Sequence, residues 1–137
     1  MPPEALEIQR WLLKAQTDWT VARKAIQPPP QLDAAAFHCQ QAVEKLLKAY
    51  LIAHNVAFEK VHDLSRLVQQ CAVVDPDFAS LAELVEPLTL YAVAYRYPGP
   101  ADPTRARVEA ALEVVAHVWE YVVARLPPDL APPSPEP

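Results

Sequence analysis

The stretch FHCQQAVEKLLKAY, residues 37–50, has the spacing of an amphipathic α-helix. The apolar side chains of this stretch, together with that of Leu51 directly after it, cover a broad arc of the helix: Ala42, Val43, Leu46, Leu47, Tyr50 and Leu51. At about 100° per residue, four polar side chains fall on one narrow stripe: His38, Gln41, Lys45 and Lys48. Glu44 precedes Lys48 by four residues, in the order that favours an ion pair. The stripe is therefore either a solvated surface or a site.

The same spacing predicts a long helix before this stretch. An apolar stripe from Ile8 to Ile26 recurs at steps of four and three residues, and three prolines at 28–30 end it. Asp33 is expected to cap the helix that contains residues 37–50, because a carboxylate accepts hydrogen bonds from the free amides of a first turn. That helix is expected to run to about Ala53.

Three more helices are predicted after it. His62 and Asp63 open a short third helix, with Asp63 as its cap. A fourth runs over 75–95 with a kink or break at Pro87, and a fifth over 102–126, opened by an aspartate and a proline. The sequence thus predicts an all-α up-and-down bundle of four long helices and one short helix, with one domain over 1–126 and a disordered proline-rich tail over 127–137.

Composition limits the class of protein. A chain of 137 residues is the size of one domain, and no apolar run is long enough to span a bilayer. Without a signal-peptide pattern, a cytoplasmic location is expected, with no membrane partner. Cys39 and Cys71 form no CxxC pattern, so we expect buried thiols and neither a disulfide framework, a metal site nor a cofactor. A net charge of −5 argues against a surface that coats nucleic acid, but it allows a local basic groove.

Two further segments carry candidate residues. His62 lies at a helix start, where free amides favour an anion, although local capping with Asp63 explains the same pattern. Arg96 between two tyrosines is either a charge at a helix end or a platform for phosphate and base. The candidate ligand-binding residues, none of them a metal ligand, are therefore His38, Gln41, Lys45, Lys48, His62, Arg96 and Tyr97.

Taken together, these segments resemble the HEPN domain family. The resemblance rests on W-x-x-K-A-x-x-D at 11–18, FHCQQAVEKLLKAYL at 37–51, HDL at 62–64, YRYP at 95–98 and a final amphipathic helix. It covers the chain to about Leu126 and implies a small α-helical bundle that commonly dimerises. Members of the family include ribonuclease toxins encoded beside a minimal nucleotidyltransferase, and domains proposed to bind nucleotides.

The sequence departs from the ribonuclease members at one point. Their motif has an Arg followed four to six residues later by His. If Arg96 is that Arg, the His belongs at 100–102, where this chain has Pro100, Ala101 and Asp102. Asp102 is also suited to capping the fifth helix. Cleavage of RNA by its 2′-hydroxyl needs a base, which His38 or His62 would have to supply.

Three functions remain open from the sequence. The first is a homodimeric module that binds a nucleotide or an RNA phosphate, as the helical partner of a minimal nucleotidyltransferase in a toxin–antitoxin-type pair. The second is a metal-independent ribonuclease toxin that uses Arg96, the best catalytic candidate, with a displaced His. The third is a non-catalytic bundle that binds another protein. An enzymatic role is not assigned from the sequence.

Overall fold

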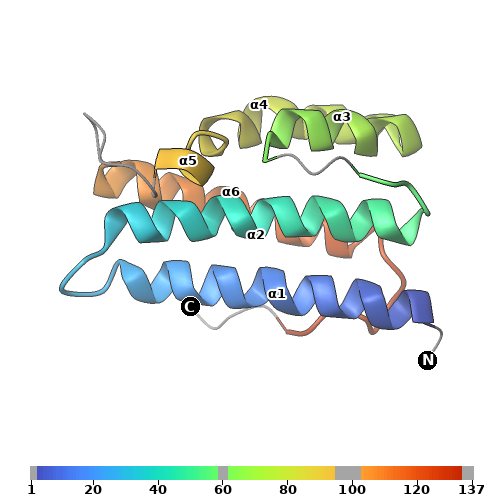
Figure 1. Cartoon of the computed structure of the whole chain (residues 1–137), viewed down its shortest axis with the longest axis horizontal. Helices are drawn as coiled ribbons and strands as arrows, with labels where there is room; N and C mark the ends of the chain where they lie inside the picture. The colour runs from blue at the N-terminus through green and yellow to red at the C-terminus, as the bar shows by residue number, and fades with distance from the viewer. Residues whose placement is uncertain (1–2, 59–61, 95–102, 134–137) are drawn as a thin grey trace.

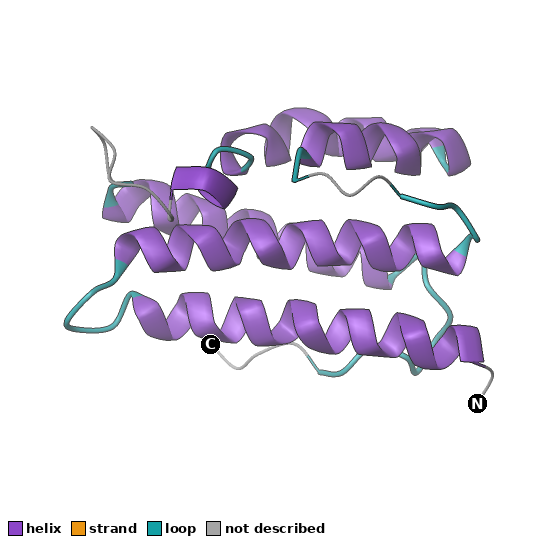
Figure 2. Ribbon diagram, in the orientation of Figure 1, coloured by secondary structure: helices purple, strands orange, loops and turns teal. Residues whose placement is uncertain are grey.

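Three long helices form the body of the bundle: α1 (Pro3–Ala25), α2 (Leu32–Ala53) and α6 (Arg105–Val123) (Figure 1). The computed structural model describes residues 3–58, 62–94 and 103–133. In these ranges all regular structure is helical and no strand occurs (Figure 2), which confirms the predicted all-α class. The predicted apolar stripes are buried, because each long helix turns its apolar face to the others.

Helix α2 lies at the centre and packs against α1, α6, α3 (Leu64–Val74) and α5 (Tyr91–Ala94). Trp19 of α1 and Trp119 of α6 meet with ring centroids 5.5 Å apart, so aromatic packing also joins the two outer helices. The largest of the fully buried side chains come from α1, from α2 and from the segment 64–81: Leu12, Leu46, Leu47, Leu51, Leu64, Leu67, Phe78 and Leu81.

A second layer covers α2 on the side of α3 (Leu64–Val74). The predicted fourth long helix is instead a chain of short elements: η1 (Pro76–Leu81), α4 (Ala82–Val85), η2 (Glu86–Leu88) and α5 (Tyr91–Ala94). Pro87 lies in the first turn of η2, where its missing N–H costs no helical hydrogen bond, so the predicted break falls there. The described ranges therefore contain three long helices where four were expected.

Two helix starts agree with the sequence and two differ. Asp63 caps α3 by accepting from the amides of Ser65 and Arg66, and Asp75 caps the segment that follows α3, both as predicted. Asp33 lies in the first turn of α2 rather than at its cap position, which Gln31 occupies, although its carboxylate accepts from the amide of Ala34 at 2.9 Å. Thr104 caps α6, whereas the predicted cap, Asp102, lies outside the described residues. The hydroxyl of Thr104 accepts from the amide of Arg107, so the helix begins two residues later than a cap at 102 would place it.

The chain beyond α6 turns back along α1 (Figure 1). Leu126 and Leu130 are only 8% and 6% exposed, and the side-chain amide of Gln16 donates to the carbonyl oxygen of Pro133. In the tail predicted to be disordered from 127 onward, Leu130 and Ala131 therefore pack against the bundle, and Pro133 accepts the hydrogen bond from Gln16. Leu130 is the one leucine among the prolines of this segment, and its burial supplies the apolar contact.

Candidate functional site

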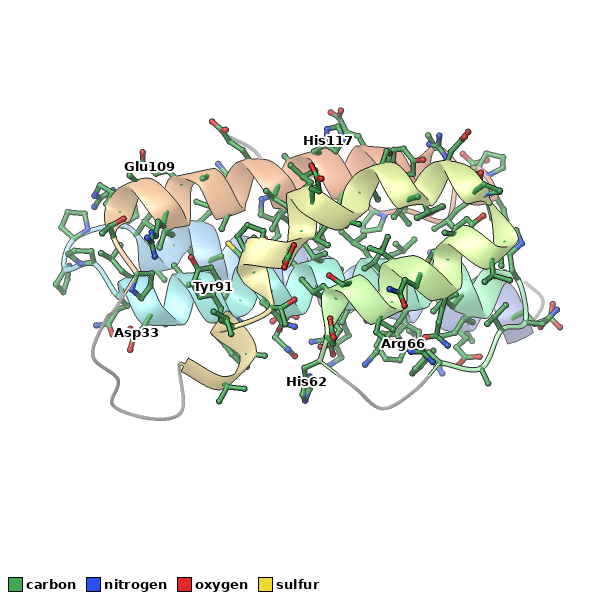
Figure 3. All side chains as sticks on the ribbon, turned by 90° about the horizontal axis from the view of Figure 1, so that it is seen from above. Asp33, His62, Arg66, Tyr91, Glu109 and His117 are labelled. Atoms are coloured by element: carbon green, nitrogen blue, oxygen red, sulfur yellow. The ribbon has the colours of Figure 1, made fainter. Side chains whose placement is uncertain are left out.

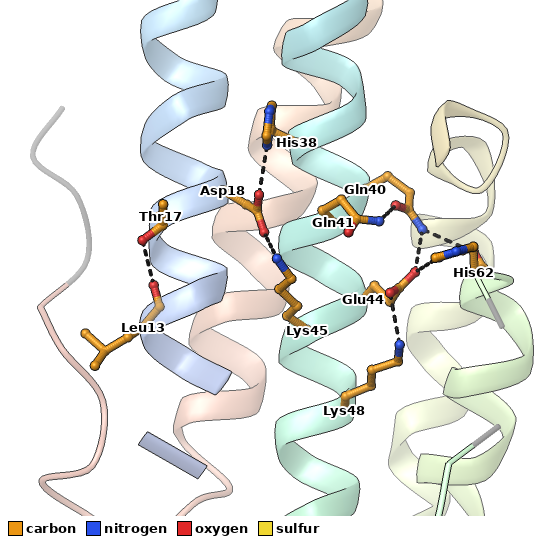
Figure 4. Close-up of polar contacts among 10 residues, drawn as sticks. All are labelled: Leu13, Thr17, Asp18, His38, Gln40, Gln41, Glu44, Lys45, Lys48 and His62. Carbon is orange, nitrogen blue, oxygen red and sulfur yellow. Dashed lines mark hydrogen bonds and ion pairs between the residues drawn. The ribbon is translucent and has the colours of Figure 1, made fainter. Parts of the chain in front are cut away.

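Asp18 draws two residues of the predicted stripe toward α1. His38 Nδ1 lies 2.8 Å from Asp18 Oδ1, and Lys45 Nζ lies 2.6 Å from Asp18 Oδ2. The carboxylate is 9% exposed, while the imidazole and the lysine side chain are about a quarter exposed. These three residues, the Asp18 cluster, occupy the seam between α1 and α2 (Figure 4). The ionised carboxylate accepts from both partners and fixes the directions of two exposed groups.

Glu44 organises a second cluster on the other side of α2. His62 Nδ1 lies 2.8 Å from Glu44 Oε1, and Lys48 Nζ lies 3.0 Å from Glu44 Oε2. The side-chain amide of Gln40 donates to Glu44 Oε1 and to the backbone oxygen of His62, both at 3.1 Å. Gln41 donates in turn to Gln40 Oε1 at 2.6 Å. Gln40, Glu44, Lys48 and His62 are the Glu44 cluster (Figure 4).

The Glu44 cluster is buried except for its histidine. Gln40, Glu44 and Lys48 are at most 8% exposed, whereas the side chain of His62 is 55% exposed at the entrance to α3 (Figure 3). A carboxylate at Nδ1 favours the neutral tautomer of the imidazole that carries its proton on that atom, and in this tautomer Nε2 carries the lone pair. Two buried polar residues thus hold His62, Glu44 at its ring and Gln40 at its backbone carbonyl.

Lys48 also connects this cluster with aromatic side chains. Its Nζ lies 5.1 Å from the ring centroid of Phe58 and 5.9 Å from that of Trp11. The two rings meet edge to face at 5.7 Å. Because Lys48 pairs with Glu44 and faces two rings, its ammonium group is satisfied within the fold. Its position is that of an internal counter-charge rather than of an exposed phosphate ligand.

A groove of about 420 Å³ opens beside the Asp18 cluster, between α1 and α2. Its lining residues, which define the α1–α2 groove, are Glu7, Arg10, Trp11, Lys14 and Lys45. Arg10 and Lys14 are exposed and have no ion-pair partner within the described ranges. Three cations and one indole ring therefore share a concave surface, a combination that suits a phosphate and a base.

The sequence-predicted site residues do not form one stripe. His38 and Lys45 turn to Asp18, whereas Gln41, Lys48 and His62 belong with Gln40 and Glu44. Arg96 and Tyr97 lie outside the described residues.

Sequence reasoning missed Arg10, Glu7 and Gln40 entirely. The available signal was on α1, where Glu7, Trp11, Lys14 and Asp18 follow steps of four, three and four residues and so share one face.

The thiols are buried, as predicted. Cys39 and Cys71 are both free, and burial raises the pKa of each from 9.0 to about 12. Thiols with such pKa values stay protonated near neutral pH and are unsuited to nucleophilic work. No group of three or more potential metal ligands gathers within the described part of the chain. Of the described helices, none has the length and apolar character needed to cross a bilayer.

The protein is an all-α bundle in which two carboxylates, those of Asp18 and Glu44, hold polar side chains in place around the second helix. The HEPN domain family model matches residues 8–126, which is most of the chain, and the chain belongs to this family. Comparisons with curated proteins and with solved structures gave no match. Family membership indicates a nucleotide- or RNA-related module.

Proposed function

We propose that the protein is a nucleotide- or RNA-phosphate-binding module and that the α1–α2 groove holds its ligand. The observation that carries the proposal is the convergence of Arg10, Lys14 and Lys45 around Trp11. Arg10 and Lys14 are exposed and attract phosphate, Lys45 is partly exposed beside them, and the indole offers a face on which a base stacks. The overall charge of −5 does not oppose this, since the cations are gathered in one groove.

Asp18 prepares the groove for its ligand. Its Oδ2 fixes the ammonium of Lys45 at 2.6 Å, so the lysine loses little side-chain freedom when a phosphate arrives. Lys48 and Phe58 support the indole of Trp11 in a similar way, from within the bundle. Arg10 and Lys14 supply the charge that no carboxylate neutralises in the described structure.

The wider assignment is a homodimer that acts in the cytoplasm beside a minimal nucleotidyltransferase, as one half of a toxin–antitoxin-type pair. Its support is the resemblance of the HxxQAxEK, HDL and RYP elements to members with such partners. Sedimentation of the purified chain, alone and mixed with the protein encoded beside it, tests both associations. If the chain sediments as a monomer and does not bind the protein encoded beside it, this part of the proposal is refuted.

Calorimetry with ATP, GTP and a short RNA tests the groove itself. We expect binding that weakens about tenfold in Lys14→Ala, because one charge-assisted contact is lost, and that weakens further as salt rises. Lys24→Ala is the matched control, since Lys24 is an exposed lysine of the same helix outside the groove. Absence of binding to all three ligands, or equal affinities in Lys14→Ala and the wild type, would refute the proposal.

The Glu44 cluster favours a second candidate function, metal-independent cleavage of RNA. His62 has its Nδ1 on a buried carboxylate and a free Nε2, as a base for a 2′-hydroxyl requires. The 2′-oxygen would attack the adjacent phosphorus while Nε2 takes its proton, and the bond to the 5′-oxygen would break. That oxygen would take a proton from solvent, so the products are a 2′,3′-cyclic phosphate and a 5′-hydroxyl. A cleavage assay in excess chelator tests this. Activity that is absent in the wild type, or that is unchanged in His62→Asn, would exclude His62 as that base.

A further inference from the structure

Glu7 is an unexpected member of a groove proposed to hold phosphate. Among the groove residues it alone carries negative charge, and it faces a ligand space shared with Arg10, Lys14 and Lys45. Arg10 follows it by three residues on the same helix, yet no ion pair joins Glu7 to any residue in the described structure. A free carboxylate weakens phosphate binding by repulsion, so a ligand of this groove has to offer hydrogen-bond donors to that carboxylate.

The order of side chains along α1 gives the groove a direction. Glu7, Trp11 and Lys14 follow steps of four and three residues, so they lie on one face with the indole in the middle. Seven residues of helix rise by about 10 Å. That length is comparable to the extent of a purine mononucleotide from its base-pairing edge to its phosphate. An acceptor therefore lies at one end, an aromatic ring at the centre, and the Lys14 and Lys45 cations at the other end.

We infer that the α1–α2 groove selects guanine nucleotides. The guanine base stacks on Trp11, its N1–H and 2-amino group donate to the carboxylate of Glu7, and its phosphate lies at Lys14 and Lys45. This inference rests on the proposed function, and it adds the identity of the base. Hydrogen bonds from two adjacent donors to one carboxylate are charge-assisted and bidentate, which gives them both strength and geometric selectivity.

Other bases lack the required edge. An ionised carboxylate accepts hydrogen bonds and donates none. Guanine presents two neighbouring donors, whereas adenine and cytosine each place an acceptor beside their amino group, and that lone pair would face the carboxylate. Uracil has one donor between two carbonyl oxygens. Hypoxanthine keeps the N1–H of guanine but lacks the 2-amino group, so inosine monophosphate isolates the contribution of the second donor.

Calorimetry with GMP, IMP and AMP at constant salt tests the inference. We expect GMP to bind roughly tenfold more tightly than AMP, the lower part of the range for a bidentate base contact, with IMP between them. Glu7→Gln is expected to bring the ratio of GMP to AMP affinities close to one, because the amide offers a donor as well as an acceptor. Glu4→Gln, an exposed carboxylate of the same helix outside the groove, is expected to keep the wild-type ratio.

The outcomes separate this inference from the function on which it rests. Equal affinities for GMP and AMP in the wild type would overturn guanine selection and leave phosphate binding in place. A preference for GMP that survives in Glu7→Gln would overturn the role of Glu7. No binding of any of the three nucleotides would overturn the proposed nucleotide site and guanine selection together.

Discussion

His62 Nδ1 lies 2.8 Å from Oε1 of Glu44, and this contact joins an exposed imidazole to a carboxylate that is 4% exposed. The carboxylate is held in turn by Lys48 and Gln40. Burying an ion pair costs desolvation that its attraction offsets only in part, and apolar residues of similar size often serve stability as well. A network of this kind is better explained by what it positions than by the stability it adds.

Removing one charge of the buried pair is expected to destabilise the fold. In Glu44→Ala the ammonium of Lys48 stays buried without its carboxylate, and the free energy of unfolding is expected to fall by about 3 kcal/mol. The double variant Glu44→Leu with Lys48→Leu removes both charges and is expected to recover most of that loss. Urea denaturation measures both changes. A double variant that is less stable than Glu44→Ala would show that the pair itself stabilises the fold.

The protonation site of His62 is expected to depend on Glu44. With Glu44 present, the neutral imidazole should carry its proton on Nδ1, because only that nitrogen faces the carboxylate. Nitrogen NMR of the histidine rings distinguishes the two tautomers directly. His117, which is exposed and has no carboxylate partner in the described ranges, is the internal reference. A predominant Nε2–H form of His62 would contradict the described contact.

Stability is expected to fall in alkali because of the two thiols. Burial raises the pKa of Cys39 and Cys71 from 9.0 to about 12. Above about pH 9 the unfolded chain therefore releases these protons while the native state keeps them, and stability falls as pH rises. Each thiol lowers the free energy of unfolding by up to about 1.4 kcal/mol per pH unit in this range. Well below pH 9 the thiols do not make stability depend on pH.

Urea midpoints at pH 8 and pH 10 measure this slope. The double variant Cys39→Ala with Cys71→Ala is expected to lose less stability over that interval than the wild type, whatever its stability at pH 8. A residual decline is expected from Tyr50, whose pKa is raised chiefly by burial and also by Asp75. Equal declines in both proteins would mean that the thiols ionise in the native state as readily as in the unfolded chain.

Packing of the C-terminal segment gives another prediction. Leu130 is 6% exposed against the bundle, so Leu130→Ala is expected to lower the free energy of unfolding by about 2 kcal/mol, the smaller end of the range for a buried leucine. Leu90→Ala is the control, since Leu90 is 75% exposed and its loss is expected to cost less than about 0.5 kcal/mol. Equal stabilities of the two variants would show that burial of Leu130 adds no stability, as expected if residues 127–133 are disordered.

The long helices could be predicted from sequence because their signal is local and repeated. Apolar residues at helical spacing must be buried together, and in the described structure Leu12, Leu46 and Val115 are all fully buried. Asp63 as a cap was predictable for the same reason, since a cap acts on amides two and three residues away. Packing of the tail was not predictable, because Leu130, the one leucine among its prolines, carries no periodic signal.

The site could be predicted only in part. A helical wheel places His38, Lys45 and Lys48 around the axis of their own helix, but it does not say what lies opposite. Asp18 precedes His38 by 20 residues, and Glu44 precedes His62 by 18. Those partners, fixed by the packing of α1 and α3 on α2, divide the stripe into two clusters and neutralise Lys48. The α1–α2 groove likewise depends on how α1 packs on α2, which a helical wheel of α2 alone does not show.

The indole N–H signal of Trp11 tests the central claim most directly. In a proton–nitrogen NMR titration with GTP and with a short RNA, we expect this signal to shift together with the amides around Lys14 and Lys45. The signals of Trp19 and Trp119, which are buried and packed on each other, should stay in place. A saturating ligand that leaves the Trp11 signal unmoved, or that shifts only residues remote from α1 and α2, would contradict the α1–α2 groove as the binding site.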